Sequence, residues 1–275
     1  MKGPTTTRSE AEDSLASAAS ASPSFVVLAL TRLRSSSIGW GLWQLAASVL
    51  PCNAPKHLLF DKTLGSGREA GFGLAPGLDH QGYLAAFDDR AAAESFFQSG
   101  ERLAAYAAHA IESAVFLLAP YSVRGSWSGH SLTPSPALAV AAGEPIAALT
   151  RASIRPHKAA SFWARSPAAE ADLKNAKGCL LAAGLGEAPL LRQATFSLWE
   201  STQAMTDYAH SGGHHQAIAS AYANGFFSET MFVRFRLLAA RGQWQGRPAT
   251  VFGEAARQSA LREGVGEAPQ EAMHA

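Results

Sequence analysis

The segment Phe25-Val-Val-Leu-Ala-Leu-Thr-Arg32 decides the fold, because its end recurs in a similar strand-like context later in the chain. Leu30-Thr31-Arg32 returns as Leu149-Thr150-Arg151, an offset of 119 residues. Ser126-Trp127-Ser128-Gly129 is matched by Gln243-Trp244-Gln245-Gly246, an offset of 117 residues. Correspondences in the same order at nearly the same offset indicate an internal duplication.

A third correspondence lies between these two. Phe87-Asp88-Asp89, followed by an alanine-rich helical segment, parallels Trp199-Glu200 and the helical segment after it. Each repeat therefore predicts the order strand, helix, loop, strand, helix, strand. The expected strands are 25–32, 82–87, 114–119, 146–154, 191–198 and 231–238, and the expected helices are 38–50, 90–108, 157–165, 201–209 and 214–223.

This order predicts an α+β fold of two tandem ferredoxin-like repeats, with two antiparallel sheets packed face to face. We expect a disordered leader over 1–23, the first repeat over 24–133 and a linker over 134–144. The second repeat is expected over 145–246 and a disordered tail over 247–275, since both termini lack hydrophobic periodicity.

Composition excludes several classes of function. Apolar residues make up 47% and charged residues 16%, which favours a large core or an apolar cavity. Lys and Arg number 23 against 22 Asp and Glu, so nucleic acid is not an expected partner. No run reaches the roughly 18 apolar residues of a membrane span. Cys52 and Cys179 lie far apart, as expected for buried residues of a cytoplasmic protein.

Two short motifs that would indicate phosphate binding or hydrolysis are not supported by the sequence. Gly65-Ser66-Gly67-Arg68-Glu69-Ala70-Gly71 resembles a phosphate loop, but further glycines and Pro76 follow where a helix should begin. We interpret it as a structural or cavity-lining loop. A nucleophile elbow of the Gly-x-Ser-x-Gly type is absent from the sequence, so Ser-His-Asp hydrolysis has no local support.

His210, His214 and His215 form the densest group of histidines. Gly212 and Gly213 interrupt a helix there, so we expect a new helix to start close to His214. The residues alone leave three roles open, namely an exposed or structural histidine, a heme or metal ligand, or an acid/base catalyst.

Arginines also stand out within apolar strands. Arg151, Arg192 and Arg234 each fall in such a strand, where a guanidinium must pair or face a polar ligand group. A carboxylate or propionate partner is one hypothesis for them. The tryptophans Trp127, Trp163, Trp199 and Trp244 are expected mainly in the core.

The second repeat closely resembles the spheroidene monooxygenase family, the acyclic carotenoid 2-ketolases. The resemblance extends from about Phe25 to Gly246, and Leu64–Gly67 with Gly71-Phe72 carries it in the first repeat. Its motifs in the second repeat are Pro145–Ala152, Phe162-Trp163, Gly186–Pro189 with Arg192–Trp199, and Phe227–Glu229 with Phe232–Phe235.

The resemblance implies a heme-dependent monooxygenase that uses O2 and a ferredoxin-type electron donor to introduce a 2-keto group into acyclic carotenoids. It also implies a duplicated dimeric α+β barrel with heme on the side of the second repeat. His214 matches the family histidine that opens the last helical segment, so it is the expected iron ligand, with His215 as the alternative. Arg151 and Arg192 are expected to contact the cofactor.

Two rival functions remain open at this point, a heme-dependent lyase or dehydratase of the same fold and a non-enzymatic heme or carotenoid-binding protein. We expect a cytoplasmic protein, with a peripheral position at the inner membrane as the alternative, because carotenoids reside in bilayers. Trp40, Trp43 and Leu50 form a helical stripe that either packs in the core or docks on the membrane.

Overall fold

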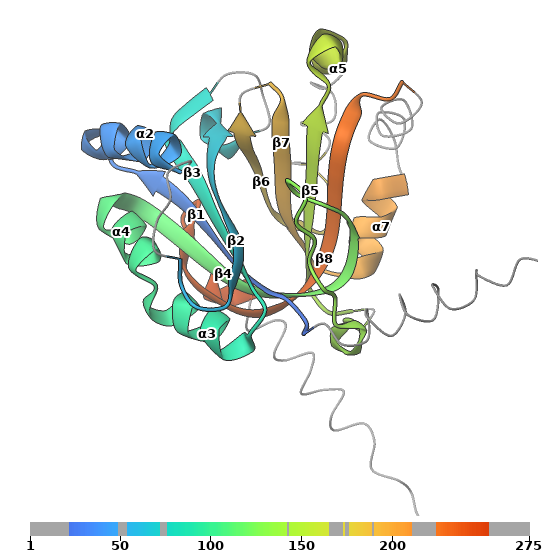
Figure 1. Cartoon of the computed structure of the whole chain (residues 1–275). Coiled ribbons are helices and arrows are strands. Elements are labelled where there is room, and N and C mark those ends of the chain that lie inside the picture. Colours follow the sequence, from blue (N-terminus) through green and yellow to red (C-terminus); the bar gives the residue numbers. More distant parts are fainter. Residues whose placement is uncertain are drawn as a thin grey trace, which may run out of the picture.

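The computed structural model describes residues 22–48, 54–71, 76–141, 143–164, 173, 176–188, 190–210 and 224–252. The expected helix 214–223, with His214 and His215, lies outside them, as do Cys52, the leader up to residue 21 and the tail from residue 253. The described residues form a mixed α+β fold around a large antiparallel sheet (Figure 1).

The elements fall into two halves of the chain. The first half contains β1 (Phe25–Leu33), α2 (Ile38–Ala47), β2 (Leu58–Gly67), β3 (Pro76–Phe87), α3 (Arg90–Ser99), α4 (Glu101–His109) and β4 (Ala110–Gly125). The second half contains β5 (Ile146–Ile154), α5 (Ala159–Trp163), β6 (Cys179–Ala188), β7 (Arg192–Trp199), α7 (Thr202–His210), β8 (Phe227–Trp244) and β9 (Arg247–Pro248).

Both halves have the same strand order. It is β4-β1-β3-β2 in the first half and β8-β5-β7-β6 in the second. The halves join at two seams, a single pair of Gly65 with Gly186 between β2 and β6, and a long ladder between β4 and β8. The expectation of two sheets packed face to face was therefore wrong, because these seams close the strands into one continuous sheet.

The core lies mainly inside this closed sheet. Alternate residues of each strand point inward, so Leu28 and Leu30 of β1 meet Phe116, Phe196 and Phe235 from both halves in one buried cluster. The outer face of the first half carries a second cluster beneath α3 and α4. A smaller one lies beneath α7 on the second half.

Two strands were missing from the sequence prediction. β2 lies in the segment expected to be a loop, so Gly65-Ser66-Gly67 is strand rather than loop. β6 was also missed, although Leu181, Ala183 and Leu185 alternate inward. β6 is rich in alanine and glycine, which gives a weak strand signal, and β2 ends in Gly65-Ser66-Gly67 at the start of a glycine-rich stretch.

The expected helix 90–108 is two helices. Asp89 caps α3 by accepting a hydrogen bond of 2.7 Å from the Ala92 amide. Gly100 then adopts an extended ψ of 126° and separates α3 from α4, which is consistent with the low helix propensity of glycine.

Packed structure continues beyond the expected start of the tail at Arg247. β9 pairs with the end of β8, and Ala249 and Phe252 are buried in the core. No helix of the described ranges combines the length and apolar character needed to cross a bilayer.

Candidate functional site

Arg151 is the most deeply buried charged side chain of the sequence-derived candidates. It lies on the inward face of β5, after Ala147 and Leu149, and its side chain is 2% exposed. Such a guanidinium is stable only with partners close by. Because β5 turns Arg151 inward, we expect acidic side chains close to it inside the closed sheet.

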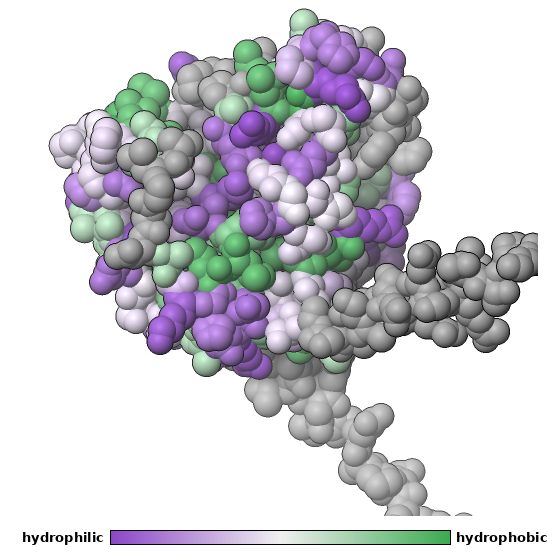
Figure 2. All heavy atoms as spheres, in the orientation of Figure 1, coloured by the Kyte–Doolittle hydropathy of each residue, from purple (hydrophilic) through white to green (hydrophobic). Residues whose placement is uncertain are grey.

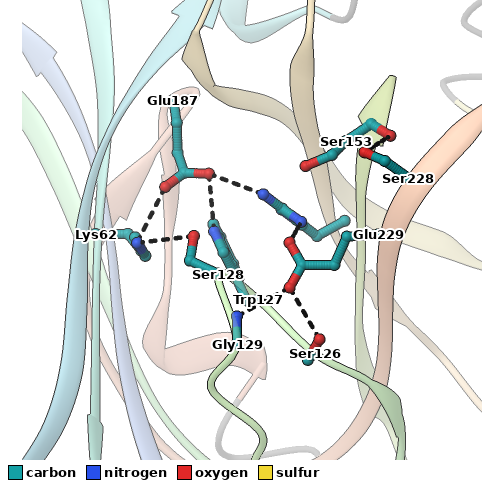
Figure 3. A network of polar contacts seen from close by, with 10 residues as sticks. Lys62, Ser126, Trp127, Ser128, Gly129, Ser153, Glu187, Ser228 and Glu229 are labelled. Carbon is teal, nitrogen blue, oxygen red and sulfur yellow. Dashed lines mark hydrogen bonds and ion pairs between the residues drawn. The ribbon is translucent and has the colours of Figure 1, made fainter. Parts of the chain in front are cut away.

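Two carboxylates meet this requirement. Arg151 pairs through Nη1 with Glu229 of β8, and its Nη2 lies 3.3 Å from Oε2 of Glu187 on β6. Lys62 of β2 completes the charge balance, with Nζ 3.2 Å from Oε1 of Glu187. Figure 3 shows Lys62, Glu187 and Glu229 converging from different strands.

The indole of Trp127 lies within the same network. Its Nε1 donates a hydrogen bond of 2.9 Å to Oε2 of Glu187. The Arg151 guanidinium carbon is 5.6 Å from the centre of the Trp127 ring, within cation–π range. These contacts, together with those of Lys62, link the first half to the second.

Hydrogen bonds lower the pKa values of both acids. Desolvation acts to raise the pKa of Glu229, but donors from Gly129, Ser126, Ser128 and Arg151 outweigh it and hold the pKa at about 2. Desolvation also opposes ionisation of Glu187, yet Trp127, Lys62 and Arg151 lower its pKa. Both carboxylates are therefore ionised near neutral pH, and they balance the two cations.

The predicted cofactor arginines thus occupy different surroundings. Arg151 contacts carboxylates of the protein itself on the inner face. Arg192 is exposed at the start of β7, where it pairs in the strand ladder with Ser153. By strand alternation both arginines share one face of the sheet, but Arg192 lies at its exposed end and Arg151 is buried. Nothing in the sequence identified Lys62, Glu187 and Glu229 as the partners of Arg151, because they lie far apart in the chain.

The outer face of the second half is the better candidate for a binding site, as a comparison with the first half shows. When Thr31 is matched to Thr150, Ala29 of β1 corresponds to Ala148 of β5. Ala29 pairs with Tyr83 and Val115, which are 3% and 4% exposed. They belong to the cluster under α3 and α4, so this face is filled.

The matching row of the second half is built from smaller and polar residues. Ala148 pairs with Ser197 of β7 and with Arg234 of β8, and Ser197 pairs with Ala182 of β6. Arg234 is exposed, although Val115 is buried at the matching position. The large side chains of the first half are therefore replaced here by smaller ones, although Ser197 is still buried and Ala148 and Ala182 pack against the edge of the cluster beneath α7.

The next row continues this open surface. Thr150 pairs with Phe232 and Thr195, and Thr195 pairs with Gly184. Thr150 is exposed, whereas its counterpart Thr31 is 1% exposed. Among the described elements, α7 covers one end of this sheet, where Met205 packs near Trp199 and the cluster reaches Ala148 and Ala182. We call the rows around Ala148 and Thr150 the open face.

Of the clustered histidines, the structure describes His210. It is the exposed last residue of α7, and its Nδ1 lies 2.9 Å from the Thr206 carbonyl oxygen. The prediction of His214 or His215 as an iron ligand falls outside the described residues and stays a prediction.

Comparisons with known proteins give a consistent set of relatives. The chain is 44% identical over 225 residues to a spheroidene monooxygenase of Rubrivivax gelatinosus, an alignment that covers 81% of this chain and 85% of the relative. It is 36% identical over 215 residues to a spheroidene monooxygenase of Rhodobacter capsulatus, covering 78% and 89%. No protein-family model matches the chain.

Solved structures resemble it more distantly. An aldoxime dehydratase in complex with butyraldoxime has a TM-score of 0.49 at 9% identity, covering 79% of this chain and 80% of that chain. An anthrone oxidase-like protein has a TM-score of 0.30 at 11% identity, covering 82% and 96%. The identity and coverage of the sequence relatives decide the assignment: the chain belongs to the spheroidene monooxygenase family.

Proposed function

We propose that this chain is a heme-dependent monooxygenase that introduces a 2-keto group into acyclic carotenoids, with O2 and a reduced ferredoxin as co-substrates. The observation that carries the proposal is the 44% identity to a relative named spheroidene monooxygenase over 85% of that relative. The open face of the second half supports it independently, because it offers a binding surface where the first half is filled.

The open face fits a heme in shape and charge. A planar macrocycle needs a surface without large side chains. Thr150 is exposed and Ala148 and Thr195 are half-buried there, while the small residues Ser197 and Gly184 lie buried beside them. The carboxylate side groups of the macrocycle need a cation, and Arg234 lies exposed in the same row as Ala148. We assign this contact to Arg234, one of the three strand arginines for which the sequence suggested it, because the guanidinium of Arg151 already pairs with two acids.

Bound heme would supply oxygen activation at its iron, chemistry that protein side chains do not provide. His214, or its neighbour His215, would hold the iron, as the sequence resemblance implies for the second half of the chain. Thr150 offers an exposed hydroxyl on the open face, and half-buried Phe232 beside it offers an apolar contact for a polyene. The chain's part is to orient the C-2 methylene and to exclude water from it.

The reaction requires electrons as well as oxygen. Each hydroxylation of the methylene consumes one O2, two electrons and two protons, and it releases one water. A second hydroxylation at the same carbon followed by loss of water yields the ketone. The proposed ferredoxin supplies the electrons, a requirement that distinguishes this function from that of a lyase or dehydratase.

The test begins with the purified, heme-supplemented protein. A Soret band and a pyridine hemochrome value near one heme per chain are expected. Turnover of spheroidene is then measured with O2 and reduced ferredoxin, and the 2-keto product should depend on both. Stoichiometric heme without donor-dependent turnover would instead favour a lyase or a binding protein, and the absence of heme would overturn the proposal.

A further inference from the structure

Helix α2 presents an apolar surface that the fold leaves uncovered. None of its ten residues is charged, and Gly41 is its one buried residue. Leu42 and Trp43 are 44% and 62% exposed. A surface helix of a globular protein normally turns charged and polar residues outward. The outward side of α2 is therefore suited to contact something other than water.

The orientation of α2 is set by its inward side. The Trp40 ring stacks on His109 with 4.1 Å between ring centres and meets Tyr106 edge-on at 5.1 Å. A Cβ on Gly41 would lie 2.3 Å from Leu33 and 2.8 Å from Gln81. This close approach fixes the helix and keeps Leu42 and Trp43 outward. The structure thus separates Trp40 from Trp43, and Leu50 lies outside the described residues.

Two arginines lie next to this helix. Arg34 lies just before it in the chain and is exposed. Arg102 of α4 donates from Nη1 to Oε1 of Gln44 at 3.2 Å. Glu101 is an exposed acid beside Arg102, so cations outnumber acids here. An apolar centre with a basic rim matches the interface of a bilayer that contains anionic lipid.

The position of α2 also suits substrate transfer. A Cβ on Gly65 would lie 3.8 Å from Leu45 of α2, and Gly65 pairs with Gly186 of β6 at the seam between the halves. β6 in turn provides Ala182 and Gly184 of the open face. Figure 1 shows α2 at one corner of the molecule, and Figure 2 shows hydrophobic atoms exposed there.

We propose that α2 is a membrane-docking helix, which places Leu42 and Trp43 in the interface of an anionic bilayer while Arg34 and Arg102 contact lipid phosphates. Tryptophan favours this interface because its ring is apolar and its N–H is polar. The inference rests on the proposed function, since an acyclic carotenoid reaches the open face from the lipid phase.

The experiment is sedimentation of the full chain with vesicles of equimolar phosphatidylcholine and phosphatidylglycerol. The variant carries Leu42→Ser and Trp43→Ser together, and Val251→Ser is the matched control, because Val251 is 50% exposed on the second half. The double variant should bind vesicles at least ten-fold more weakly, whereas the control binds as the unmodified chain does. Circular dichroism checks that the unfolding midpoints agree.

Unchanged vesicle binding by the double variant would overturn the proposal. A second outcome would also overturn it. If the unmodified chain self-associates, and the double variant is monomeric but binds vesicles equally well, then α2 is a contact between copies of the chain. The vesicle assay needs neither heme nor turnover, so its result stands apart from that of the proposed function. With active protein, the double variant should raise KM for vesicle-borne carotenoid and leave turnover of detergent-dispersed carotenoid unchanged.

Discussion

The indole nitrogen of Trp127 donates a hydrogen bond of 2.9 Å to a carboxylate oxygen of Glu187. Trp127 follows the last strand of the first half, and Glu187 lies near the end of β6 in the second half. Glu187 also faces Arg151 and Lys62. The Glu187 carboxylate therefore connects the two halves of the closed sheet through side chains of both.

Glu187→Gln should destabilise the protein by about 2 kcal/mol, because it leaves buried Arg151 with one carboxylate partner and removes the carboxylate that pairs with Lys62. Urea unfolding measures the change. Glu94→Gln is the control, since Glu94 forms an exposed pair with Arg90 and should cost less than about 0.5 kcal/mol. Equal effects of the two substitutions would contradict a structural role for Glu187.

Stability should fall in acid as Glu229 is protonated. Its pKa of about 2 in the folded chain lies below the ordinary value of 4.5. The unfolded chain thus binds the proton more readily, so the contribution is present above about pH 4.5 and is lost as the pH falls toward 2. Urea midpoints across this range should change less steeply for Glu229→Gln than for the unmodified chain; parallel curves would rule the contribution out.

Gly125→Ala and Gly242→Ala should each cost more than about 2 kcal/mol. These glycines have φ values of +82° and +84°, and an added Cβ would lie 2.0 Å from a carbonyl oxygen of the neighbouring strand in both cases. Gly129→Ala is the control, because Gly129 has φ +80° with open space around it. It should cost only about 1 kcal/mol. Thermal unfolding of the three variants tests the difference.

Thr150→Phe should weaken heme uptake at least ten-fold at unchanged stability, because it fills the open face with an exposed ring. Spectroscopic titration with heme measures the affinity, and circular dichroism measures the unfolding midpoint. Gln243→Phe serves as control, since Gln243 is exposed near the end of β8, outside the open face. Heme affinity that stays equal in both variants would place the cofactor elsewhere.

Replacement of both His214 and His215 by alanine should abolish the Soret band of the heme-loaded chain. His210→Ala is the matched control, because His210 is exposed at the end of α7 and its Nδ1 faces a backbone carbonyl. Absorption spectra and hemochrome values of the variants decide the assignment. A double variant with full heme occupancy and an unchanged spectrum would show that the ligand lies elsewhere.

Local sequence patterns predicted much of the fold. The apolar run that begins at Phe25 and the segment Ile146–Ile154 were recognised as strands because buried strands read as short apolar runs. β6 was missed because its small residues carry little periodic signal, and β2 was missed because its last residues, Gly65-Ser66-Gly67, run into a glycine-rich stretch that was interpreted as a loop. The repeated Leu-Thr-Arg motif identified the duplication, but it carried no information on how the two halves join.

The candidate site divided in the same way. Sequence indicated that an arginine in an apolar strand needs a polar partner, and Arg151 has two. It could not identify Glu187 and Glu229 as those partners, because closure of the sheet brings them together from separate strands. The difference between the filled and the open face was equally invisible, since Thr31 and Thr150 lie in the same motif.

The sequence by itself determined the duplication, most strands and the family, because these depend on local patterns and on motifs read along the chain. Only the tertiary structure decided the single closed sheet, the partners of Arg151 and the exposure of Thr150, Arg234 and Trp43. The physical reason is that burial and pairing depend on which distant segments pack together. The two halves have the same strand order, but different side chains lie on the outer faces of their sheets.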